Sequence, residues 1–426
     1  MTLAFHLGRV YTLSLAEILR LFSRRGVEFE IKELFREVLI VKTVQELDIE
    51  SLQKRLGGTV KIMQIIDELT KKQEEDYLNF TVKKYFSVKT LSQKFLKEYK
   101  GKIQFGISIY ALSDRINLSG QNKRIGMEIK KTLQEENVSC RVVVPEGFST
   151  ALPSVAVTNN HLLEKGAEID LLVSFKKVYI AKTLTVQDFA DYGRRDYQRP
   201  VRDMRIGLLP PKVAQIMINL AEYDPKEREK GEYVLDPFVG GGTILQECML
   251  IGFRGLGSDI SKKAVDDAYK NLEWFRIRYK MPPGRFQLEV ADAAKVSKTF
   301  PDKKPVAIVT EGTLGPHYSE TPDKAEMEKN FEDLSKIYIS AFKEFKKILE
   351  KGRTVVSALP AYRLPKGYIS FPHIDKILKL GYTIEDPIPI DLQKKYSFLK
   401  VTPRKSIIYD RKDQVVVREI MVFKVK

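Results

Sequence analysis

The sequence predicts an α/β fold, with a mostly parallel sheet in the carboxyl-terminal half of the chain. From about residue 206 onward, short apolar runs typical of buried strands alternate with amphipathic helical segments, the pattern of a parallel sheet covered by helices on both faces. The first of these strands leads into a glycine-rich turn and a helix, which is where open α/β sheets place their ligands. A chain of 426 residues, 43% of them hydrophobic, is long enough for two or three domains.

The first 80 residues predict a small α/β unit. A helix is expected where apolar residues gather on one side, at Leu13, Leu15, Ile18, Leu19, Leu21 and Phe22. Strands are expected at 38–41 and at 59–63, the second of them after the turn Gly57-Gly58. The polar segment Asp67–Asp76 is expected to be helical.

A second unit is expected from about residue 81 to residue 185. Its predicted elements are a basic helix at 123–133 and strands at 103–110, 154–158, 169–175 and 178–183. Much of the positive charge lies in this part of the chain, because residues 51–150 hold 18 Lys and Arg against 11 Asp and Glu. An excess of this kind favours contacts with a polyanion.

An arginine- and tyrosine-rich linker is expected at 186–205. Its basic and aromatic residues are Tyr192, Arg194, Arg195, Tyr197, Arg199, Arg202 and Arg205. Arginine with interleaved tyrosine can pair with phosphates and stack on bases, so Arg194, Arg195 and Arg199 are candidate substrate-binding residues. The sequence leaves open an alternative, in which these arginines pair with the neighbouring aspartates at positions 188, 191, 196 and 203.

The carboxyl-terminal half, residues 206–426, has predicted strands at 233–237, 255–259, 286–291, 306–311 and 354–359. Helices are expected to begin near Thr243, Ser261 and Lys324. At the end of the chain, 406–409 and 415–425 flank the polar turn Asp410-Arg411-Lys412-Asp413. This arrangement predicts a carboxyl-terminal antiparallel hairpin.

The chain carries 72 Lys and Arg against 56 Asp and Glu, a formal net charge of +16. This excess indicates a polyanionic partner, either nucleic acid or an anionic membrane surface. No apolar run approaches the roughly 18 residues needed to span a bilayer, and the excess is spread over both halves of the chain, which does not suit a membrane patch, so no membrane association is expected. The two cysteines, Cys140 and Cys248, are far apart and the four histidines are scattered. The sequence therefore predicts no disulfides and no metal site. It also predicts a reducing, cytoplasmic setting.

The sharpest motif is Asp236-Pro237-Phe238-Val239-Gly240-Gly241-Gly242-Thr243, between a predicted strand and a helix. Its glycines let the backbone turn tightly and approach a ligand closely, and the helix amino terminus offers N–H groups to that ligand. Leu245 stands where a dinucleotide fingerprint needs its third glycine, and no Gly-Lys-Ser/Thr follows as in a phosphate-binding loop. The motif therefore predicts a nucleotide-like ligand that is not held by a pyrophosphate.

Two further aspartates end the next two predicted strands. Asp259 comes about 20 residues after the glycine turn, where a carboxylate accepts hydrogen bonds from the hydroxyls of a ribose, and Asp292 ends the following strand. A lone aspartate at such a position is usually the N-cap of the next helix. Three acids at three successive strand ends, with Asp236 in the glycine turn, indicate a binding site instead.

The motif at 236–243 resembles the first motif of S-adenosylmethionine-dependent amino-methyltransferases, which modify exocyclic nitrogens of bases. The chain as a whole resembles the THUMP-containing tRNA guanine-N2 methyltransferases, on the residues Leu56–Ile62, Gln187-Asp188, Arg195-Asp196, Arg199-Pro200, Arg202-Asp203 and Leu209–Ala214. The resemblance implies a ferredoxin-like domain at 1–80 and a THUMP RNA-binding domain at 81–185. These would present tRNA to a Rossmann-like methyltransferase domain at 206–426.

The resemblance also implies roles for single residues in binding S-adenosyl-L-methionine. The methionine part of this cofactor would be surrounded by Asp236, Gly240, Gly242 and Thr243. Asp259 would hold its ribose, in agreement with the place of this acid after the glycine turn, and Asp292 would bind its adenine amino group. Phe238, Ile260 and Ala293, close to these residues in the chain, complete the expected cofactor site.

The chain departs from this family at the methyl-transfer motif. Relatives end the strand with Asp or Asn, then two prolines and an aromatic residue, whereas this chain has Glu311-Gly312-Thr313-Leu314. Glu311 is expected to accept a hydrogen bond and later a proton from the substrate amine, with Gly312, Thr313 and Leu314 beside the base and Tyr318 or His317 stacking on it. A longer acid on a loop with glycine in place of proline is expected to aim less well at the amine.

These features favour a tRNA methyltransferase that acts on an exocyclic base nitrogen, guanine N2 above all. The altered motif leaves two alternatives open: a different substrate atom, or a tRNA-binding or maturation protein that no longer transfers methyl groups. A DNA amino-methyltransferase would share the glycine motif but gives residues 1–200 no role. The sequence leaves open the modified nucleotide, one methylation or two, a small activating subunit as in some relatives, and the oligomeric state.

Overall fold

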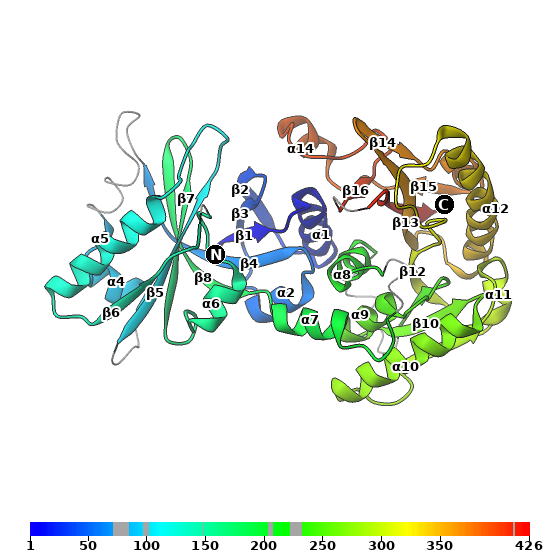
Figure 1. Ribbon diagram of the computed structural model, residues 1–426, viewed down its shortest axis with the longest axis horizontal. Helices are drawn as coiled ribbons and strands as arrows, with labels where there is room; N and C mark the ends of the chain where they lie inside the picture. Colours follow the sequence, from blue (N-terminus) through cyan, green and yellow to red (C-terminus); the bar gives the residue numbers. More distant parts are fainter. Residues whose placement is uncertain (71–84, 97–101, 148, 203–207, 222–231, 412–413) are drawn as a thin grey trace. The chain divides into compact units, whose positions relative to one another are not determined.

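The computed structural model describes residues 1–70, 85–96, 102–147, 149–202, 208–221, 232–411 and 414–426. The described chain forms two compact units (Figure 1). The first consists of Met1–Tyr11, Val27–Lys54 and Thr59–Phe189, and the second of Thr12–Gly26, Arg55–Gly58 and Ala190–Lys426. Two segments from the start of the chain therefore belong to the second unit. The division of residues 1–185 into ferredoxin-like and THUMP domains stays a prediction.

In the described part of the first unit, eight strands form one sheet in the order β2-β3-β1-β4-β8-β7-β5-β6. The strands are β1 (Thr2–Leu7), β2 (Phe29–Phe35), β3 (Val38–Thr43), β4 (Thr59–Thr70), β5 (Ile103–Ala111), β6 (Cys140–Val143), β7 (Gly166–Val173) and β8 (Lys177–Val186). Strand β5 is parallel to β6 and β7. The other neighbours in this order are antiparallel.

The helices of this unit are α2 (Ile49–Arg55, whose last residue belongs to the second unit), α4 (Val88–Lys94), α5 (Gln121–Glu135) and α6 (Ser154–Asn159). Successive residues of β7 point to opposite faces of the sheet. Ile169 and Leu171 join a core with Ile125 of α5, whereas Leu172 joins a second cluster with Tyr110. The sheet is therefore buried on both faces, which explains the long apolar runs of its central strands.

Two sequence predictions in this unit are wrong. Residues 154–158 are not a strand but form α6, because a short run of apolar and β-branched residues can also be one buried helical turn; Val157 packs there with Leu152 and Leu162. Asp67–Thr70 are not helical but continue β4, where pairing with Lys177–Ile180 of β8 extends the ladder. The remainder of the predicted helix, 71–76, lies outside the described residues.

In the second unit, the described strands form a sheet of the order β11-β10-β9-β12-β13-β17-β15, with β14 beside β13 and β16 beside β17. They are β9 (Tyr233–Asp236), β10 (Arg254–Asp259), β11 (Phe286–Val290), β12 (Pro305–Glu311), β13 (Thr354–Leu364), β14 (Gly367–Ser370), β15 (Tyr382–Ile384), β16 (Ile407–Tyr409) and β17 (Val416–Val425). The first five strands in this order are parallel, and β13, β15 and β16 pair antiparallel with β17. The predicted mostly parallel, Rossmann-like sheet and the carboxyl-terminal antiparallel strands are confirmed.

Helices cover both faces of this sheet (Figure 1). They are α8 (Pro211–Leu220), α9 (Thr243–Ile251), α10 (Lys262–Arg278), the 3₁₀ helix η3 (Ala293–Lys295), α11 (Val296–Thr299), α12 (Lys324–Ile348), α13 (Ile374–Lys379) and α14 (Ile390–Lys395). Leu245 of α9 packs with Leu272 of α10, while Phe342 of α12 belongs to the core on the opposite face. Gly257 of β10 allows α9 to lie close, since a Cβ there would come within 2.7 Å of Leu245.

Helix α1 (Tyr11–Arg24) belongs to the second unit from its second residue onward. The fully buried carboxylate of Glu17 accepts hydrogen bonds from the Gly57 and Gly58 amides at 2.8 Å and from Asn219 of α8 at 2.7 Å. Burial raises the pKa of Glu17 to about 7, against the effect of these bonds. Among the described helices, none combines the length and apolar content needed to cross a membrane.

Candidate functional site

A pocket of about 1150 Å³ opens in the second unit at the carboxyl ends of β9, β10 and β12. The sheet order reverses between β9 and β12, and ligands of open α/β sheets bind at such a switch point. Of the predicted cofactor residues, all except Gly242 line the pocket: Asp236, Phe238, Gly240, Thr243, Asp259, Ile260, Asp292 and Ala293. The predicted substrate residues Glu311, Gly312, Thr313 and Leu314 line it as well, as do His317 and Tyr318.

The glycine turn from β9 to α9 forms one wall of the pocket. Gly240 and Gly242 have φ angles of +46° and +82°, a region that residues with a side chain rarely adopt. Gly242 is also crowded, because a Cβ there would lie 3.2 Å from Leu272 of α10. The turn therefore brings the amino terminus of α9, at Thr243, to the pocket as its sequence predicts.

Asp259 and Asp292 occupy the ends of β10 and β11 on the same side of the sheet. Asp259 accepts hydrogen bonds from the Gly240 amide at 3.1 Å and from the Ser261 amide at 3.0 Å, so it ties the glycine turn to the next strand. Asp292 is the N-cap of η3 and accepts a bond from the Ala294 amide at 2.9 Å. Both acids thus have local structural roles and also face the pocket.

Asp236 is the deepest acid of the pocket, with 2% of its surface exposed. It accepts hydrogen bonds from the Thr310 hydroxyl at 2.7 Å and from the Phe238 amide at 3.2 Å. Burial raises its pKa to about 7, and the charges of Asp259 and Glu311 add to this effect. A buried acid with two acidic neighbours favours a cationic ligand, which would stabilise its charged form.

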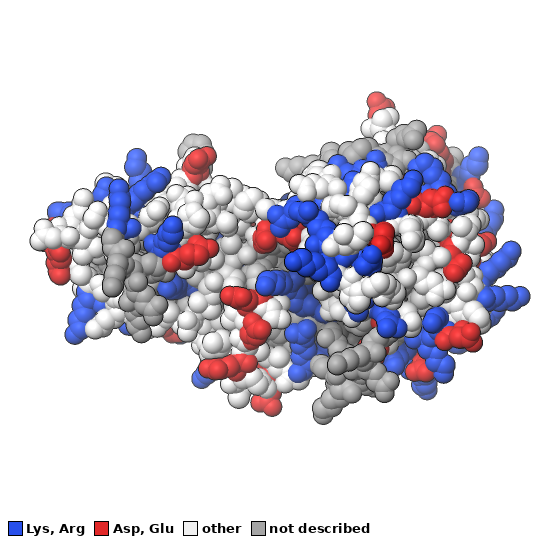
Figure 2. Space-filling model, turned by 90° about the horizontal axis from the view of Figure 1, so that it is seen from below, with Lys and Arg blue, Asp and Glu red and all other residues white. Residues whose placement is uncertain are grey.

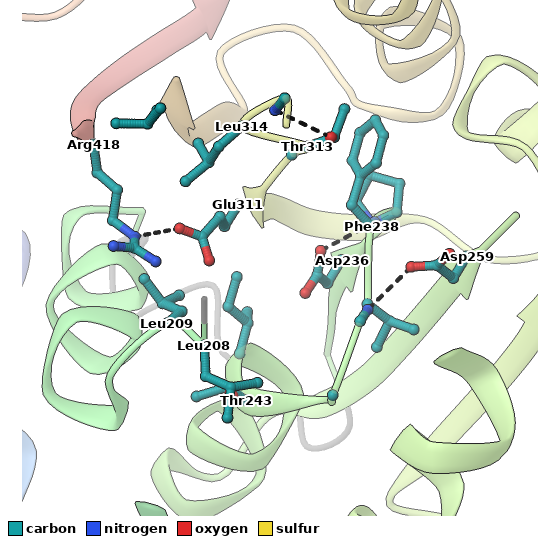
Figure 3. Close-up of a pocket in the computed structure, with 18 of the residues that line it drawn as sticks. Leu208, Leu209, Asp236, Phe238, Thr243, Asp259, Glu311, Thr313, Leu314 and Arg418 are labelled. Atoms are coloured by element: carbon teal, nitrogen blue, oxygen red, sulfur yellow. Dashed lines mark hydrogen bonds and ion pairs between the residues drawn. The ribbon is translucent and has the colours of Figure 1, made fainter. Parts of the chain in front are cut away.

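Glu311 ends β12 and forms an ion pair with Arg418 of β17 (Figure 3). The Nε atom of Arg418 donates to Oε1 of Glu311, and its Nη1 atom donates to Gln414 at 3.2 Å. Arg418 is 1% exposed, whereas the Glu311 side chain keeps 15% of its surface exposed. The predicted acid is therefore held from one side by a buried guanidinium.

The loop after Glu311 is tightly packed. A Cβ at Gly312 would lie 2.6 Å from the ring of Tyr338, whose hydroxyl donates to the Thr313 carbonyl at 2.9 Å. Gly315 has a φ of +90°, and a Cβ there would lie 2.4 Å from the Asn330 side chain. These glycines let α12 approach the loop closely. Packing against α12 therefore restrains this loop although it has glycine in place of proline, and the expectation that Glu311 aims less well at an amine stays a prediction.

The three predicted substrate-binding arginines do not line the pocket. Residues 189–197 are not a linker but form α7 (Phe189–Tyr197). Arg195 is buried and pairs with Glu247 at 3.2 Å, Arg199 is buried and donates to the Thr243 hydroxyl at 2.6 Å, and Arg194 pairs with Asp191 at 3.1 Å. Arg195 also lies 3.4 Å from Asp191, and Arg199 lies 3.6 Å from Asp196. All three arginines therefore pair with a neighbouring aspartate, as the alternative interpretation of the sequence has it. Phosphate contacts by Arg195 and Arg199 would require both side chains to leave the interior.

Tyr197 and Arg202, from the same segment, do line the pocket. The guanidinium carbon of Arg202 lies 4.7 Å from the centroid of the Tyr197 ring, and this tyrosine is 66% exposed. Both residues belong to the arginine- and tyrosine-rich segment noted in the sequence. That pattern does not tell which of its side chains are buried and which face the pocket. Arg418 and Tyr338 gave no such signal, since each lies in an ordinary apolar strand or helix pattern.

Comparisons with known proteins show a similar fold over the whole chain and a similar sequence over about a third of it. No protein-family model matches the chain. Its sequence is 33% identical over 136 residues to a tRNA (guanine(10)-N2)-dimethyltransferase of Pyrococcus abyssi, which is 32% of this chain and 36% of that protein. A protein of the same name from Methanocaldococcus jannaschii is 30% identical over 162 residues, 37% of this chain and 42% of the other. The matches thus span less than half the length of these relatives.

Among solved structures, TrmN from Thermus thermophilus superposes with a TM-score of 0.54 at 14% identity, over 100% of this chain and 99% of that one. At this identity the likeness concerns the fold alone, and it extends over both units. The chain therefore has the fold of TrmN, and over about a third of its length its sequence is similar to tRNA (guanine(10)-N2)-dimethyltransferases.

Proposed function

We propose that this protein is a tRNA methyltransferase that transfers a methyl group from S-adenosyl-L-methionine to an exocyclic base nitrogen, guanine N2 above all. The observation that carries the proposal is one pocket, at the switch point of the sheet, that is lined by the glycine turn, by three aspartates and by Glu311. The similarity to tRNA (guanine(10)-N2)-dimethyltransferases supports the choice of substrate.

The residues of the pocket fit this cofactor. A nucleoside attached to a cationic amino acid needs an acid for its ribose, a close backbone approach, and acids near its positive charges. Asp259 faces the pocket beside the glycine turn, and the burial of Asp236 close to Asp259 and Glu311 favours a cation. Asp236, Gly240 and Thr243 would hold the methionine part, Asp259 the ribose, and Asp292 the adenine amino group.

When bound, S-adenosyl-L-methionine supplies an electrophilic methyl group on its sulfonium. Glu311, through the carboxylate oxygen that is not bonded to Arg418, accepts a hydrogen bond from the substrate amine and orients its lone pair toward that methyl. The amine would gain the methyl group as the cofactor's carbon–sulfur bond breaks, and it would then lose one proton to Glu311 and from there to water. The backbone of Gly312 and Thr313 completes the rim of the amine site.

The apolar part of the pocket suits an extruded base. Leu208, Leu209, Leu314 and Phe238 line it, and Figure 3 shows Leu314 above Glu311 and Leu208 and Leu209 below it. A base taken out of its stack needs apolar or aromatic surfaces on which to rest. We assign this role to Leu314 in place of the aromatic residue of the family motif, with Tyr318 and His317 at the rim.

The RNA itself would meet a basic surface. Basic side chains stand over much of the face drawn in Figure 2, with acidic side chains among them. At the pocket mouth, the exposed Tyr197 and the guanidinium of Arg202 offer a stacking surface and a positive charge to the flanking nucleotides. The amino-terminal half, as a ferredoxin-like and a THUMP domain, would contribute the remaining tRNA contacts in the cytoplasm, with or without a small activating subunit.

The test is methyl transfer with purified protein. Unmodified tRNA transcript and S-adenosyl-L-methionine are incubated with the protein, and the digested nucleosides are analysed by mass spectrometry. We expect added N2-methylguanosine or its dimethyl form, and none with Asp236→Ala. Absence of a new methylated nucleoside in every tRNA tested, despite cofactor binding, would contradict the proposal.

A second candidate, a tRNA-binding or maturation protein without transfer activity, is favoured by one observation: Glu311 is engaged by Arg418. In this case tRNA binds and cofactor binding is dispensable. Binding of tRNA that is unchanged in Asp236→Ala, together with no transfer by the wild type, would select this candidate.

A further inference from the structure

We infer that Arg418 is a positioning residue that holds the Glu311 carboxylate in the orientation needed for methyl transfer; the inference rests on the proposed function. Arg418 replaces, from a distant strand, the rigidity that two prolines give the family motif next to its acid. Its role is to fix one oxygen of Glu311, so that the other oxygen faces the substrate amine.

The pairing follows from the order of the strands. Glu311 at the end of β12 is opposite Ala358 of β13, and Arg418 of β17 is opposite Pro360 of the same strand. The two side chains therefore bridge two strand spacings, about 9 to 10 Å across the sheet, together with an offset of two residues along the strands. Only long side chains can meet across that distance. An aspartate at 311, about 1.5 Å shorter, would place its carboxylate farther from the guanidinium, so the longer side chain of glutamate suits this pair.

The guanidinium itself is fixed before any substrate binds. Arg418 is 1% exposed, and Gln414 accepts a hydrogen bond from its Nη1 atom at 3.2 Å. A planar guanidinium restricts the orientation of a carboxylate more than an ammonium does. Figure 3 shows the Glu311 carboxylate between Arg418 and Asp236, with one oxygen toward Arg418 and the other turned away from it.

The backbone on the other side of Glu311 is restrained independently. Tyr338 fills the space beside Gly312 and bonds to the Thr313 carbonyl, so the chain that carries Glu311 cannot swing toward α12. Restraint of the backbone by Tyr338 and of the side chain by Arg418 leaves the carboxylate with one orientation. A merely stabilising ion pair would need neither the exposed edge of Glu311 nor its place in the pocket wall.

The experiment compares wild type, Arg418→Met, Arg418→Lys and Glu311→Gln with a matched control. The control is Arg404→Gln. Arg404 pairs at 3.5 Å with the buried Glu419, which follows Arg418 on β17, and neither Arg404 nor Glu419 lines the pocket. For each protein we measure the dissociation constants of S-adenosyl-L-methionine and tRNA by calorimetry, and kcat and KM of methyl transfer from pH 5.5 to 9.

We expect Arg418→Met to lower kcat about 100-fold, the size of loss caused by a misplacement of about 1 Å, while both dissociation constants stay within about threefold. Arg418→Lys should restore part of kcat. The double variant Glu311→Gln/Arg418→Met should have a kcat no lower than that of Glu311→Gln alone, because each single change already disrupts the same Glu311–Arg418 pair.

The experiment distinguishes failure of the positioning role of Arg418 from failure of the proposed function. If the wild type transfers methyl groups and Arg418→Met keeps its kcat, or loses kcat only as much as Arg404→Gln, the positioning role is wrong and the proposed function stands. If the wild type binds tRNA and cofactor but transfers no methyl group to any tRNA, the proposed function and the inference fall together.

Discussion

The ring of Tyr338 fills the space that a side chain at Gly312 would need. An added Cβ would lie 2.6 Å from both Cε1 and the hydroxyl oxygen of this tyrosine, which is 1% exposed and cannot move aside without disturbing the core. Glycine at 312 is therefore a packing requirement of this pocket wall. The glycine of Glu311-Gly312-Thr313-Leu314 therefore fits the packing of this loop against α12.

Gly312→Ala is expected to destabilise the protein by about 1–3 kcal/mol, because it overpacks a closed contact, and to lower methyl transfer by displacing Glu311. Urea denaturation and initial rates measure the two effects. The matched change is Gly193→Ala in α7, where a Cβ meets nothing within 4 Å; it should be neutral or stabilising by up to about 1 kcal/mol. Equal stability of both variants would show that the Tyr338 contact is not tight.

Asp236 should couple cofactor binding to proton release. Its pKa is raised to about 7 by burial, so near pH 6.5 the free protein holds this group mostly protonated. A cationic ligand stabilises the carboxylate and lowers that pKa, so binding releases more than about half a proton. The affinity for S-adenosyl-L-methionine should accordingly rise between pH 6 and pH 8.

The measurement is calorimetry at pH 6.5 in two buffers with different ionisation enthalpies. Asp236→Asn should abolish the proton release and weaken binding. Asp292→Asn, at another strand end in the same pocket, should weaken binding but keep the release. Proton release that persists in Asp236→Asn would show that a group other than Asp236 loses the proton when the cofactor binds.

Lys61 neutralises a buried acidic cluster in the first unit. It pairs with Glu168, which also accepts a bond from Thr183 at 2.7 Å, and the same hydroxyl lies 2.7 Å from Asp170. Burial and the charge of Glu168 raise the pKa of Asp170 well above its ordinary value. Lys61→Met is expected to cost about 3–5 kcal/mol, because it leaves a buried charge without its partner.

Denaturation in urea tests this expectation, with Lys94→Met as the control. Lys94 pairs with Asp67 at 2.8 Å, and both side chains are more than a third exposed, so its loss should cost no more than about 1 kcal/mol. Similar costs for the two variants would mean that the cluster does not need its lysine.

The arginines of residues 189–202 should separate into structural and RNA-binding groups. Arg195→Ala leaves buried Glu247 without its cation and should destabilise the protein by about 3–5 kcal/mol. Arg202→Ala, at the pocket mouth, should leave the unfolding midpoint unchanged and weaken tRNA binding about threefold to tenfold at fixed salt. Thermal melting and filter binding distinguish the two. Weaker tRNA binding by a normally stable Arg195→Ala protein would reverse the assignment.

The sequence predicted the second unit more fully than the first, for a physical reason. Parallel strands buried on both faces give continuous apolar runs, and the helices between them begin where expected, at Thr243, after the N-cap Ser261, and at Lys324. In the first unit, residues 154–158 read equally well as strand or helix, and Asp67–Thr70 take their strand form from pairing with β8. Such pairing is a contact between distant segments, which local patterns do not contain.

The candidate site divides in the same way. Asp236, Asp259 and Asp292 could be found because strand ends and a glycine turn are local signals. Arg418 reaches Glu311 from a residue 107 positions later, and Tyr338 reaches Gly312 from within a helix with an ordinary apolar pattern. Arg195, on the short helix α7, and Arg199, just after it, resembled phosphate ligands because the sequence does not tell which side chains of this segment face the core.

The place of helix α1 has a consequence for how the protein is made. Residues 12–26 leave the ribosome early, yet the partners of this helix include Asn219 and, through Arg20, Glu385. The second unit therefore cannot complete these contacts until residues up to Glu385 have been synthesised, whereas the first unit ends at Phe189 and can complete its sheet sooner. A fragment that begins at residue 190 would lack Glu17 and should remain incompletely folded.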